Sequence, residues 1–274
     1  MRCISKMEFY MKNDRELFKG TAYYYAKYRA GYPTEFFDFI VRYFKLDGTG
    51  QLLDLGCGTG QLTIPFAKHF EGAVGLDPEN EMLEEAAKEA DKAGEKNIKW
   101  VLQKAEEMAD DLGIFRLTTM GASFHWMERE IVLRKIYDLT EKRGGLVIVS
   151  DFRKGNRPQS GEEWKVVRKK IIEKYLGEKR RAGNSFYEEP KDKFEDLLNR
   201  SPFGGFEEWT HSYTRTWTLE AIINFLYSTS FASQRLFGDK LNEFEEELKK
   251  ELLKFEPNGV FTEQVRLQFL LARK

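Results

Sequence analysis

A glycine-rich loop preceded by a carboxylate is the part of this chain with the clearest chemistry. Asp54 lies in the apolar run 51–55, and Gly56, Gly58 and Gly60 follow it at every second position. A backbone without side chains can turn sharply and lie flat against a ligand. Asp54 adds hydrogen-bond acceptors at the end of the run. The pattern predicts a strand, a loop and a helix that together hold a ligand.

A second strand that ends in a carboxylate follows about twenty residues later. Residues 73–77 are apolar up to Asp77, whose two oxygens offer only acceptors and so suit the paired hydroxyls of a ribose. Two such β-α units in series indicate an adenosine-type nucleotide site. The alternative is a tight strand–helix turn in another kind of α/β protein.

The glycine spacing narrows the choice of nucleotide. G-x-G-x-G differs from the G-x-G-x-x-G of dinucleotide enzymes, and the chain has no G-x-x-x-x-G-K-S/T loop. The sequence D-x-G-x-G-x-G at residues 54–60 instead resembles motif I of the class I S-adenosylmethionine (SAM) methyltransferases. In that family the loop passes under the methionine part of SAM, and an acid at the position of Asp77 binds both ribose hydroxyls.

The resemblance covers residues 21–150 well and residues 206–274 more weakly. It implies SAM as the cofactor and S-adenosylhomocysteine (SAH) as its product. The residues that we expect to bind this cofactor are Tyr25, Arg29, Asp54, Gly56, Cys57, Gly58, Gly60, Asp77, Pro78, Met82, Ala105, Glu106, Ser123 and Phe124.

The segment 25–33 resembles the N-terminal Y-x-x-x-R-P-x-Y-P signature of the family, with Ala30 in place of the usual proline. Family members fold this segment over SAM, with the arginine paired to its carboxylate and a tyrosine closing the site. Arg29 can form two parallel bonds with a carboxylate, and aromatic faces attract a sulfonium charge. We therefore expect Arg29 and Tyr25 to bind the cofactor and Tyr28 to bind the substrate. The alternative is an aromatic cluster that buries an N-terminal helix.

Ala105 and Glu106 follow the third predicted strand and match the family's G-D-A-E-like sequence, which reads the adenine edge. Lys104 departs from it, because many members carry Asp there. Adenine recognition is then expected from the Ala105 backbone and from apolar packing. The alternative for Glu106 is a surface side chain that caps the next helix.

Phe124-His125-Trp126 follows the fourth predicted strand, at the edge of the sheet where open α/β folds bind ligands. The triplet resembles a methyltransferase branch that includes trans-aconitate methyltransferase. His125 can take a proton near neutral pH and is the candidate catalytic residue. With Tyr28 and Trp126 it is also expected to bind the substrate. The alternative is a structural histidine, since alignment of the two reactants supplies much of the rate of methyl transfer.

Bulk composition excludes several classes of function. The 274 residues carry 44 basic and 45 acidic side chains, so no global basic field for nucleic acid exists. Cys3 and Cys57 are the only cysteines, which predicts a reducing compartment. Cys57 fits as a small residue between glycines, and we assign it no chemistry. The sequence shows no signal peptide or membrane-spanning run, and we expect a cytoplasmic protein.

Apolar periodicity predicts an α/β fold, a doubly wound Rossmann-like sheet with a helical cap inserted before the C-terminal strands. The expected strands are 51–56, 73–77, 98–103, 117–120, 146–149, 206–216 and an edge strand at 263–272. The expected helices include 35–45, 131–140, 218–228 and 239–255, with another that starts at Pro78. The expected domains are 1–34 as an arm over the cofactor, 35–151 as the SAM-binding core, 152–205 as the cap that roofs the substrate and 206–274 as the part that completes the core.

The chain is therefore predicted to be an enzyme that transfers a methyl group from SAM to oxygen or nitrogen of a small-molecule acceptor, with a carboxylate among the candidates. Two alternatives stay open: a non-catalytic SAM-binding module and a methyltransferase of macromolecules. No metal-ligand spacing occurs, so no catalytic metal is expected. Neither a membrane nor a nucleic acid is an expected partner, and the oligomeric state is left open.

Overall fold

The computed structural model describes residues 17–109, 111–151, 161–188 and 192–274, and it divides them between two compact units. The described part of unit 1 comprises residues 17–29, 161–188 and 213–265. That of unit 2 comprises residues 30–109, 111–151, 192–212 and 266–274. Each unit is built from segments that lie far apart in the sequence.

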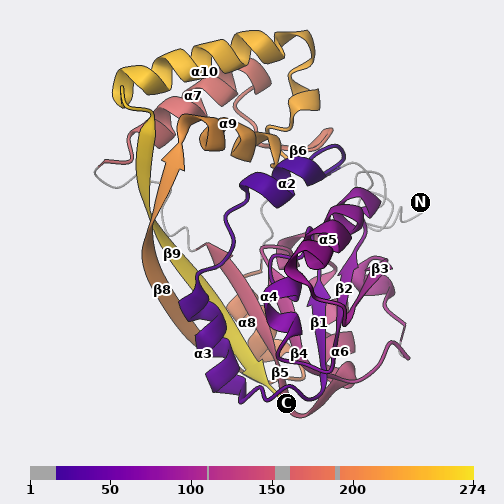
Figure 1. The fold of residues 1–274 in the computed structure, drawn as a ribbon. Helices are drawn as coiled ribbons and strands as arrows, with labels where there is room; N and C mark the ends of the chain where they lie inside the picture. Colours follow the sequence, from indigo (N-terminus) through magenta and orange to yellow (C-terminus); the bar gives the residue numbers. More distant parts are fainter. Residues whose placement is uncertain (1–16, 110, 152–160, 189–191) are drawn as a thin grey trace, which may run out of the picture. The chain divides into compact units, whose positions relative to one another are not determined.

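A seven-stranded sheet runs through unit 2, with strand order β3-β2-β1-β4-β5-β9-β8 (Figure 1). Its strands are β1 (Gln51–Leu55), β2 (Gly72–Asp77), β3 (Ile98–Leu102), β4 (Phe115–Gly121), β5 (Thr140–Asp151), β8 (Glu207–Thr218) and β9 (Val260–Arg273). Strands β1 to β5 pair in parallel, and β9 pairs antiparallel with β5. The C-terminal part of β8 and the N-terminal part of β9 belong to unit 1. The strand order reverses between β1 and β4.

Helices cover both faces of the sheet in unit 2, because buried apolar side chains alternate along its strands. Leu52 faces α3 and α4, whereas its neighbour Leu53 faces α6 and α8. The helices are α3 (Thr34–Phe44), α4 (Thr63–Ala67), α5 (Asn80–Ala93), α6 (Arg129–Leu139) and α8 (Phe194–Arg200). The doubly wound α/β fold predicted from the sequence is confirmed.

The element predictions hold for the parallel strands, and one prediction at the C-terminus is wrong. Residues 263–272 were expected to form an edge strand, but β9 lies between β5 and β8. The burial of its side chains explains the difference, because the consecutive residues Leu270 and Leu271 are buried on opposite faces of the sheet, as in an interior strand. The helix expected from Pro78 begins two residues later, at Asn80.

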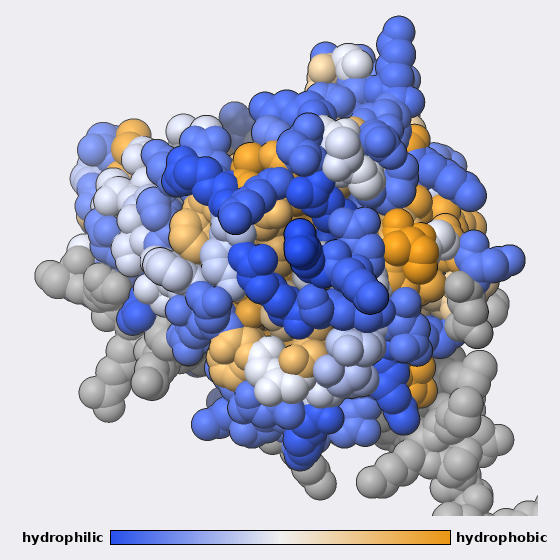
Figure 2. All heavy atoms as spheres, turned by 90° about the horizontal axis from the view of Figure 1, so that it is seen from below, coloured by the Kyte–Doolittle hydropathy of each residue, from blue (hydrophilic) through white to orange (hydrophobic). Residues whose placement is uncertain are grey.

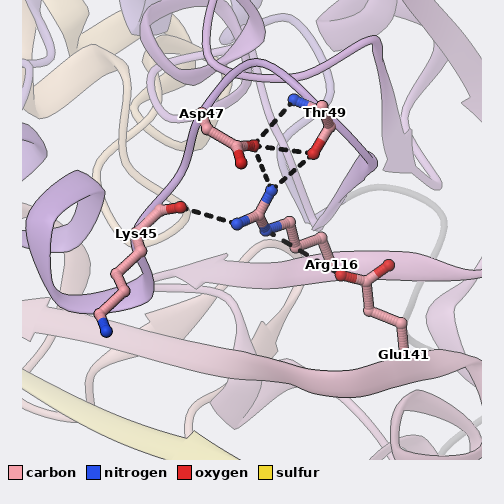
Figure 3. A network of polar contacts seen from close by, with 5 residues as sticks. All are labelled: Lys45, Asp47, Thr49, Arg116 and Glu141. Atoms are coloured by element: carbon pink, nitrogen blue, oxygen red, sulfur yellow. Dashed lines mark hydrogen bonds and ion pairs between the residues drawn. The ribbon is translucent and has the colours of Figure 1, made fainter.

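A polar network joins three segments of unit 2 at the amino edge of the parallel strands (Figure 3). Arg116 of β4 donates to Asp47, to Thr49 Oγ1 at 2.7 Å and to the Lys45 carbonyl oxygen at 2.7 Å. Glu141 of β5 lies 3.9 Å from Arg116 Nε. The Thr49 and Arg116 bonds lower the pKa of Asp47 to about 2. The network fixes the loop that leads into β1.

Unit 1 has its own apolar core. It contains α2 (Ala22–Tyr28), α7 (Trp164–Leu176), α9 (Leu219–Tyr227), α10 (Leu241–Phe255) and the short hairpin of β6 (Arg181–Ala182) and β7 (Ser185–Phe186). Trp164 is fully buried, and its indole N–H donates to the Thr262 carbonyl oxygen at 3.1 Å. The rings of Phe237 and Phe244 stack with centroids 4.0 Å apart in the same core.

The two units cut across the domains expected from the sequence. Helix α8 lies within the expected cap 152–205 but packs on α6 in unit 2, because Leu197 and Leu198 join the core there. Residues 206–274 were expected to complete the cofactor-binding core. Residues 206–212 and 266–274 belong to unit 2 with that core, whereas residues 213–265 belong to unit 1 with α7. Residues 1–16 of the expected arm and 152–160 of the expected cap lie outside the described residues.

Hydrophilic side chains predominate on the face of the molecule shown in Figure 2, and hydrophobic ones form separate patches among them. In the described part of the chain, no helix is both long enough and apolar enough to span a bilayer.

Candidate functional site at the carboxyl ends of the parallel strands

The glycine loop after β1 needs glycine for conformation and for space. Gly56, Gly58 and Gly60 have φ angles of +63°, +54° and +86°. Residues other than glycine rarely adopt this region of backbone conformation. A Cβ atom at Gly56 would lie 2.6 Å from the Cβ of Ser123. The amides of Gly56 and Cys57 both donate to the Leu76 carbonyl oxygen, at 2.8 and 3.1 Å. The loop is therefore folded tightly over the end of β2.

Asp54 lies beneath this loop and is almost completely buried. Its two oxygens accept hydrogen bonds from Thr63 Oγ1 at 2.6 Å and from Thr119 Oγ1 at 2.8 Å. Burial raises the pKa of Asp54 to about 6, although the two threonine hydrogen bonds act to lower it. Asp54 thus ties β1 to the start of α4 and to β4. The sequence did not single out Thr63 or Thr119, although Thr63 is the one polar residue of α4.

Asp77 ends β2 and is 7% exposed. One oxygen accepts the Gly58 amide and the other accepts the Glu79 amide, each at 2.9 Å. An ionised carboxylate has about four lone-pair sites, so both oxygens keep acceptor capacity beyond these two bonds. Burial raises the pKa of Asp77 to about 6. The structure brings Asp77 directly against the glycine loop, as the sequence predicted.

Cys57 is a poor nucleophile in this position. Its side chain is buried, and its thiol lies 3.7 Å from the Gly58 carbonyl oxygen. Burial and the nearby carboxylates of Asp77 and Asp54 raise the pKa of the thiol well above its usual value. The thiol therefore stays protonated at neutral pH, which agrees with its assignment as a small residue without chemistry.

Ala105 and Glu106, expected at adenine, lie after β3, and Pro78 and Met82, expected to bind the cofactor, lie after β2. Ala105 is buried at the start of a short 3-10 helix, η2 (Ala105–Glu107), and Glu106 next to it is partly exposed. Met82 is buried in the first turn of α5, whereas Pro78 is exposed. Apolar and backbone groups are thus available at this end of the sheet edge.

The segment after β4 turns sharply. Ala122 adopts φ +52°, which is rare for a residue with a side chain. Ser123 Oγ then donates to the Leu55 carbonyl oxygen at 2.7 Å and ties the turn to the end of β1. Phe124 is buried against Phe194, with ring centroids 5.0 Å apart. The backbone strain at Ala122 carried no signal in the sequence.

His125 and Trp126 complete the 3-10 helix η3 (Phe124–Trp126) at the same edge. Their ring centroids are 4.6 Å apart, and both side chains are partly exposed. The structure therefore places the candidate base and the candidate substrate residue side by side after β4. Their roles in catalysis and substrate binding stay predictions.

The expected N-terminal ligands belong to unit 1. Arg29 donates through Nε to Ser228 Oγ at 3.0 Å, and its guanidinium lies over the rings of Tyr25 and Phe225, 4.7 and 5.0 Å from their centroids. Tyr28 donates to Glu220 at 2.9 Å. These contacts are within unit 1, and cofactor or substrate binding by Tyr25, Tyr28 and Arg29 stays a prediction.

Two aromatic residues of unit 2 support the site without having been assigned to it from the sequence. Trp100 of β3 covers Gly75, where a Cβ atom would lie 2.4 Å from its ring, and it also borders Gly60. Tyr32 reaches Gly121 at the end of β4, where a Cβ atom would lie 2.7 Å from the phenol oxygen. Both contacts join residues far apart in the sequence. Tyr32 itself lies in the segment 25–33 that the resemblance expected to fold over the cofactor.

No group of three or more His, Cys, Asp or Glu side chains that could hold a metal ion occurs among the residues that the structure describes. The described polar groups of the site include backbone amides, carboxylates, hydroxyls and the imidazole of His125. Such a set suits an organic ligand with hydroxyl groups.

Comparison with known proteins finds methyltransferases among the relatives of this chain. Residues 52–144, which include the glycine loop and Asp77, match the methyltransferase domain family. An uncharacterized methyltransferase-like protein of Schizosaccharomyces pombe is 26% identical over 255 residues, which cover 93% of this chain and 92% of that protein. A probable S-adenosylmethionine-dependent methyltransferase of Saccharomyces cerevisiae is 27% identical over 128 residues, or 44% of this chain and 42% of that protein.

A solved structure is similar to this chain in its fold. The crystal structure of the YcgJ protein from Bacillus subtilis matches with a TM-score of 0.52 and 12% identity, over 86% of this chain and 97% of that one. At so low an identity the likeness is one of fold alone.

Proposed function

Because the chain belongs to the class I SAM-dependent methyltransferases, we propose that it methylates an oxygen or a nitrogen of a small-molecule acceptor. Carboxylates are among the candidate acceptors. Two statements remain predictions from the sequence: membership of the branch that includes trans-aconitate methyltransferase, and a cytoplasmic location.

The observation that carries the proposal is the position of Asp77. Its carboxylate is held by the Gly58 and Glu79 amides at the end of β2 and keeps two oxygens available as acceptors. A cis-diol fits such a group, because each hydroxyl can donate to one oxygen. The glycine loop beside Asp77 has no side chain at Gly58, so a ligand can approach its backbone closely.

The proposed roles follow the order of the strands. Ala105 would contact adenine, Asp77 the ribose, and the loop from Gly56 to Gly60 the methionine part. SAM, when bound, supplies a methyl group on a positively charged sulfur, which is already a strong electrophile. The chain's own residues then need to bind both reactants, align them and exclude water.

His125 and Trp126 are the proposed neighbours of the acceptor. The imidazole of His125 can take the proton of a hydroxyl or amine acceptor, and a carboxylate acceptor needs no base at all. Tyr28 is proposed to bind the acceptor, and Tyr25 and Arg29 to bind the amino-acid end of the cofactor. The proposal that residues 152–205 help to select the acceptor is a prediction as well.

The first test is calorimetric titration of SAM and SAH into the wild-type chain and Asp77→Ala. We expect micromolar-range binding to the wild type and a loss of roughly 1–3 kcal/mol in the variant, since two ribose hydroxyls lose their acceptor. Asp91→Ala is a matched control, because Asp91 is an exposed carboxylate near the end of α5. Absence of binding of both ligands to folded wild-type protein would overturn the proposal.

The second test measures SAH formation with panels of carboxylates, alcohols and amines, and with RNA, DNA and protein extracts as macromolecular acceptors. Turnover of a small molecule supports the proposal. Turnover of a macromolecule alone would assign the chain to the other class of methyltransferase. SAM binding without any turnover across the panels would favour the non-catalytic module.

A further inference from the structure

The turn that carries His125 and Trp126 is strained where it begins. Ala122 has φ +52°, a region in which the Cβ atom of a residue crowds its own backbone. The amide of Ala122 donates to the Val149 carbonyl oxygen at 2.9 Å, and the amide of Trp126 donates to the Ser123 carbonyl oxygen at 2.9 Å. Backbone strain of this kind persists only where the surrounding structure holds it. The contacts around the turn therefore decide where its side chains lie.

Phe124 connects this turn to α8. Its side chain is 1% exposed, and its ring packs on that of Phe194, the first residue of α8, with centroids 5.0 Å apart and planes inclined by 59°. A 3-10 helix has about three residues per turn, so successive side chains of η3 point roughly 120° apart. With Phe124 directed into the core, His125 and Trp126 take the two other directions, in which both are partly exposed. A shift of Phe124 would therefore move both side chains.

A second contact joins the same two parts of unit 2. Arg129, the first residue of α6, donates to the carbonyl oxygen of Asp192 at 2.8 Å, two residues before α8 begins. At the other end of α8, Arg200 lies 3.5 Å from the carboxylate of Asp192 and 3.7 Å from that of Glu130. The segment of α8 thus contacts the chain just before and just after the two candidate acceptor residues.

We propose that Phe194 is a positioning residue, which acts through Phe124 to fix the directions of the His125 and Trp126 side chains. The inference rests on the proposed function, because it presumes that these two side chains border the acceptor. Small displacements of aligned reactants cost much of the rate of a reaction. Phe194 lies outside residues 52–144, which match the methyltransferase domain family. The orientation of the candidate acceptor residues therefore depends on a segment beyond the matched domain.

NMR spectroscopy of the histidine ring protons tests the proposal without cofactor or acceptor. The chain has three histidines, and His125→Gln identifies the signals of His125. The ring of Trp126 lies 4.6 Å from that of His125, so the chemical shifts of these protons depend on how the two rings lie. We expect Phe194→Ala to shift and broaden the His125 signals and to leave those of His69 and His211 unchanged.

Two conservative variants show whether the ring of Phe194 is what matters. Phe194→Leu keeps most of the apolar volume and folds more readily than the alanine variant, and it should shift the His125 signals less but in the same direction. Phe194→Tyr keeps the ring and should give the signals of the wild type. Wild-type signals in both Phe194→Ala and Phe194→Leu would overturn the inference.

Phe203→Ala is the matched control. Phe203 is also a partly buried phenylalanine that packs on the core of unit 2, and its ring lies on that of Tyr137 in α6, with centroids 5.2 Å apart. Its removal opens a comparable gap at the far end of α6 and should leave the His125 signals in place. Equal changes in Phe203→Ala and Phe194→Ala would show a general loosening of the core and would contradict a positioning role.

The effect on the reaction separates this inference from the proposed function. With any acceptor that the wild type methylates, the kcat of Phe194→Ala should fall about 10- to 100-fold. The Kd for SAH should stay unchanged, because Asp77 and the glycine loop belong to other elements. An unchanged kcat, or an equal loss of SAH binding, would overturn the inference and leave the proposed function intact. Absence of SAM and SAH binding to the wild type would instead overturn the proposed function.

Discussion

Asp54 in β1 and Asp77 at the end of β2 are two carboxylates beside one loop with different partners. Both are nearly buried, and burial raises the pKa of each to about 6. Both oxygens of Asp54 accept threonine hydroxyls, so this residue holds the elements together. The oxygens of Asp77 accept the backbone amides of Gly58 in the loop and of Glu79 after β2, and they keep room for a ligand. The motif and its resemblance predicted both as cofactor ligands; the partners of Asp54 favour a positioning role, and binding by Asp77 stays a prediction.

Cofactor affinity should fall as the pH drops below about 6. The proposed contact needs an ionised Asp77, whose pKa in the folded chain is about 6, so binding at lower pH requires loss of a proton. We expect the affinity for SAM to fall up to about tenfold per pH unit below that value. Titrations from pH 5 to pH 8 measure the slope. Asp77→Asn keeps the size of the side chain but has no carboxylate, so it should bind SAM more weakly and with a flatter pH profile. Some pH dependence should remain, because Asp54 titrates in both proteins. Equal slopes would contradict the assignment.

Without ligand, the free energy of unfolding should increase as the pH is lowered through the same range, whereas the affinity for SAM decreases. The pKa of Asp77 rises from an ordinary value of 3.8 to about 6 on folding, so between these two values the folded state binds more protons than the unfolded state. The free energy of unfolding therefore falls as the pH rises through this window. The same sign holds for Asp54.

At the scale of elements, glycine can be required for two separable reasons: its positive φ angle and the lack of space for a Cβ atom. Gly56 combines φ +63° with a collision at 2.6 Å for any Cβ atom, whereas Gly48 combines φ +90° with open space. Gly48→Ala should cost roughly 1–2 kcal/mol, the strain of the left-handed region. Gly56→Ala should cost roughly 2–5 kcal/mol, since overpacking adds a further 1–3 kcal/mol. Urea unfolding of both variants measures the difference, and equal losses would show that Ser123 moves aside freely.

The sequence predicted the elements of the parallel sheet because apolar runs and glycines are local signals. It could predict Asp77 beside the loop, since the carboxyl ends of neighbouring parallel strands share one edge. It could not predict that Tyr32 meets Gly121, because that contact depends on where α3 packs. The outer position of β8 was missed for a similar reason: its pattern, with Trp209 exposed and Trp217 buried, does not reveal which strand it pairs with.

At the scale of the whole molecule, each unit has its own apolar core. A destabilising substitution in one unit should therefore lower the stability of that unit more than that of the other. Trp164→Ala removes a fully buried side chain from unit 1 and should cost about 3–5 kcal/mol. Hydrogen exchange should then accelerate in α7, α9 and α10 more than in β1 and β4. Ile40→Ala, in the α3 side of unit 2, is the reciprocal control and should have the reverse pattern. Uniform acceleration by either variant would show that the chain unfolds as one cooperative unit.

The position of β9 has a consequence for how the chain is made. Ribosomes release a protein from its N-terminus, and residues 260–273 leave the tunnel after every other strand of the sheet. Yet β9 lies between β5 and β8, so β8 has no place in the sheet until residues 260–273 have been made. The outer side of β5 is therefore unpaired from the time that β5 is made until β9 follows, and a chain truncated before residue 260 would leave that strand as a bare edge, open to aggregation.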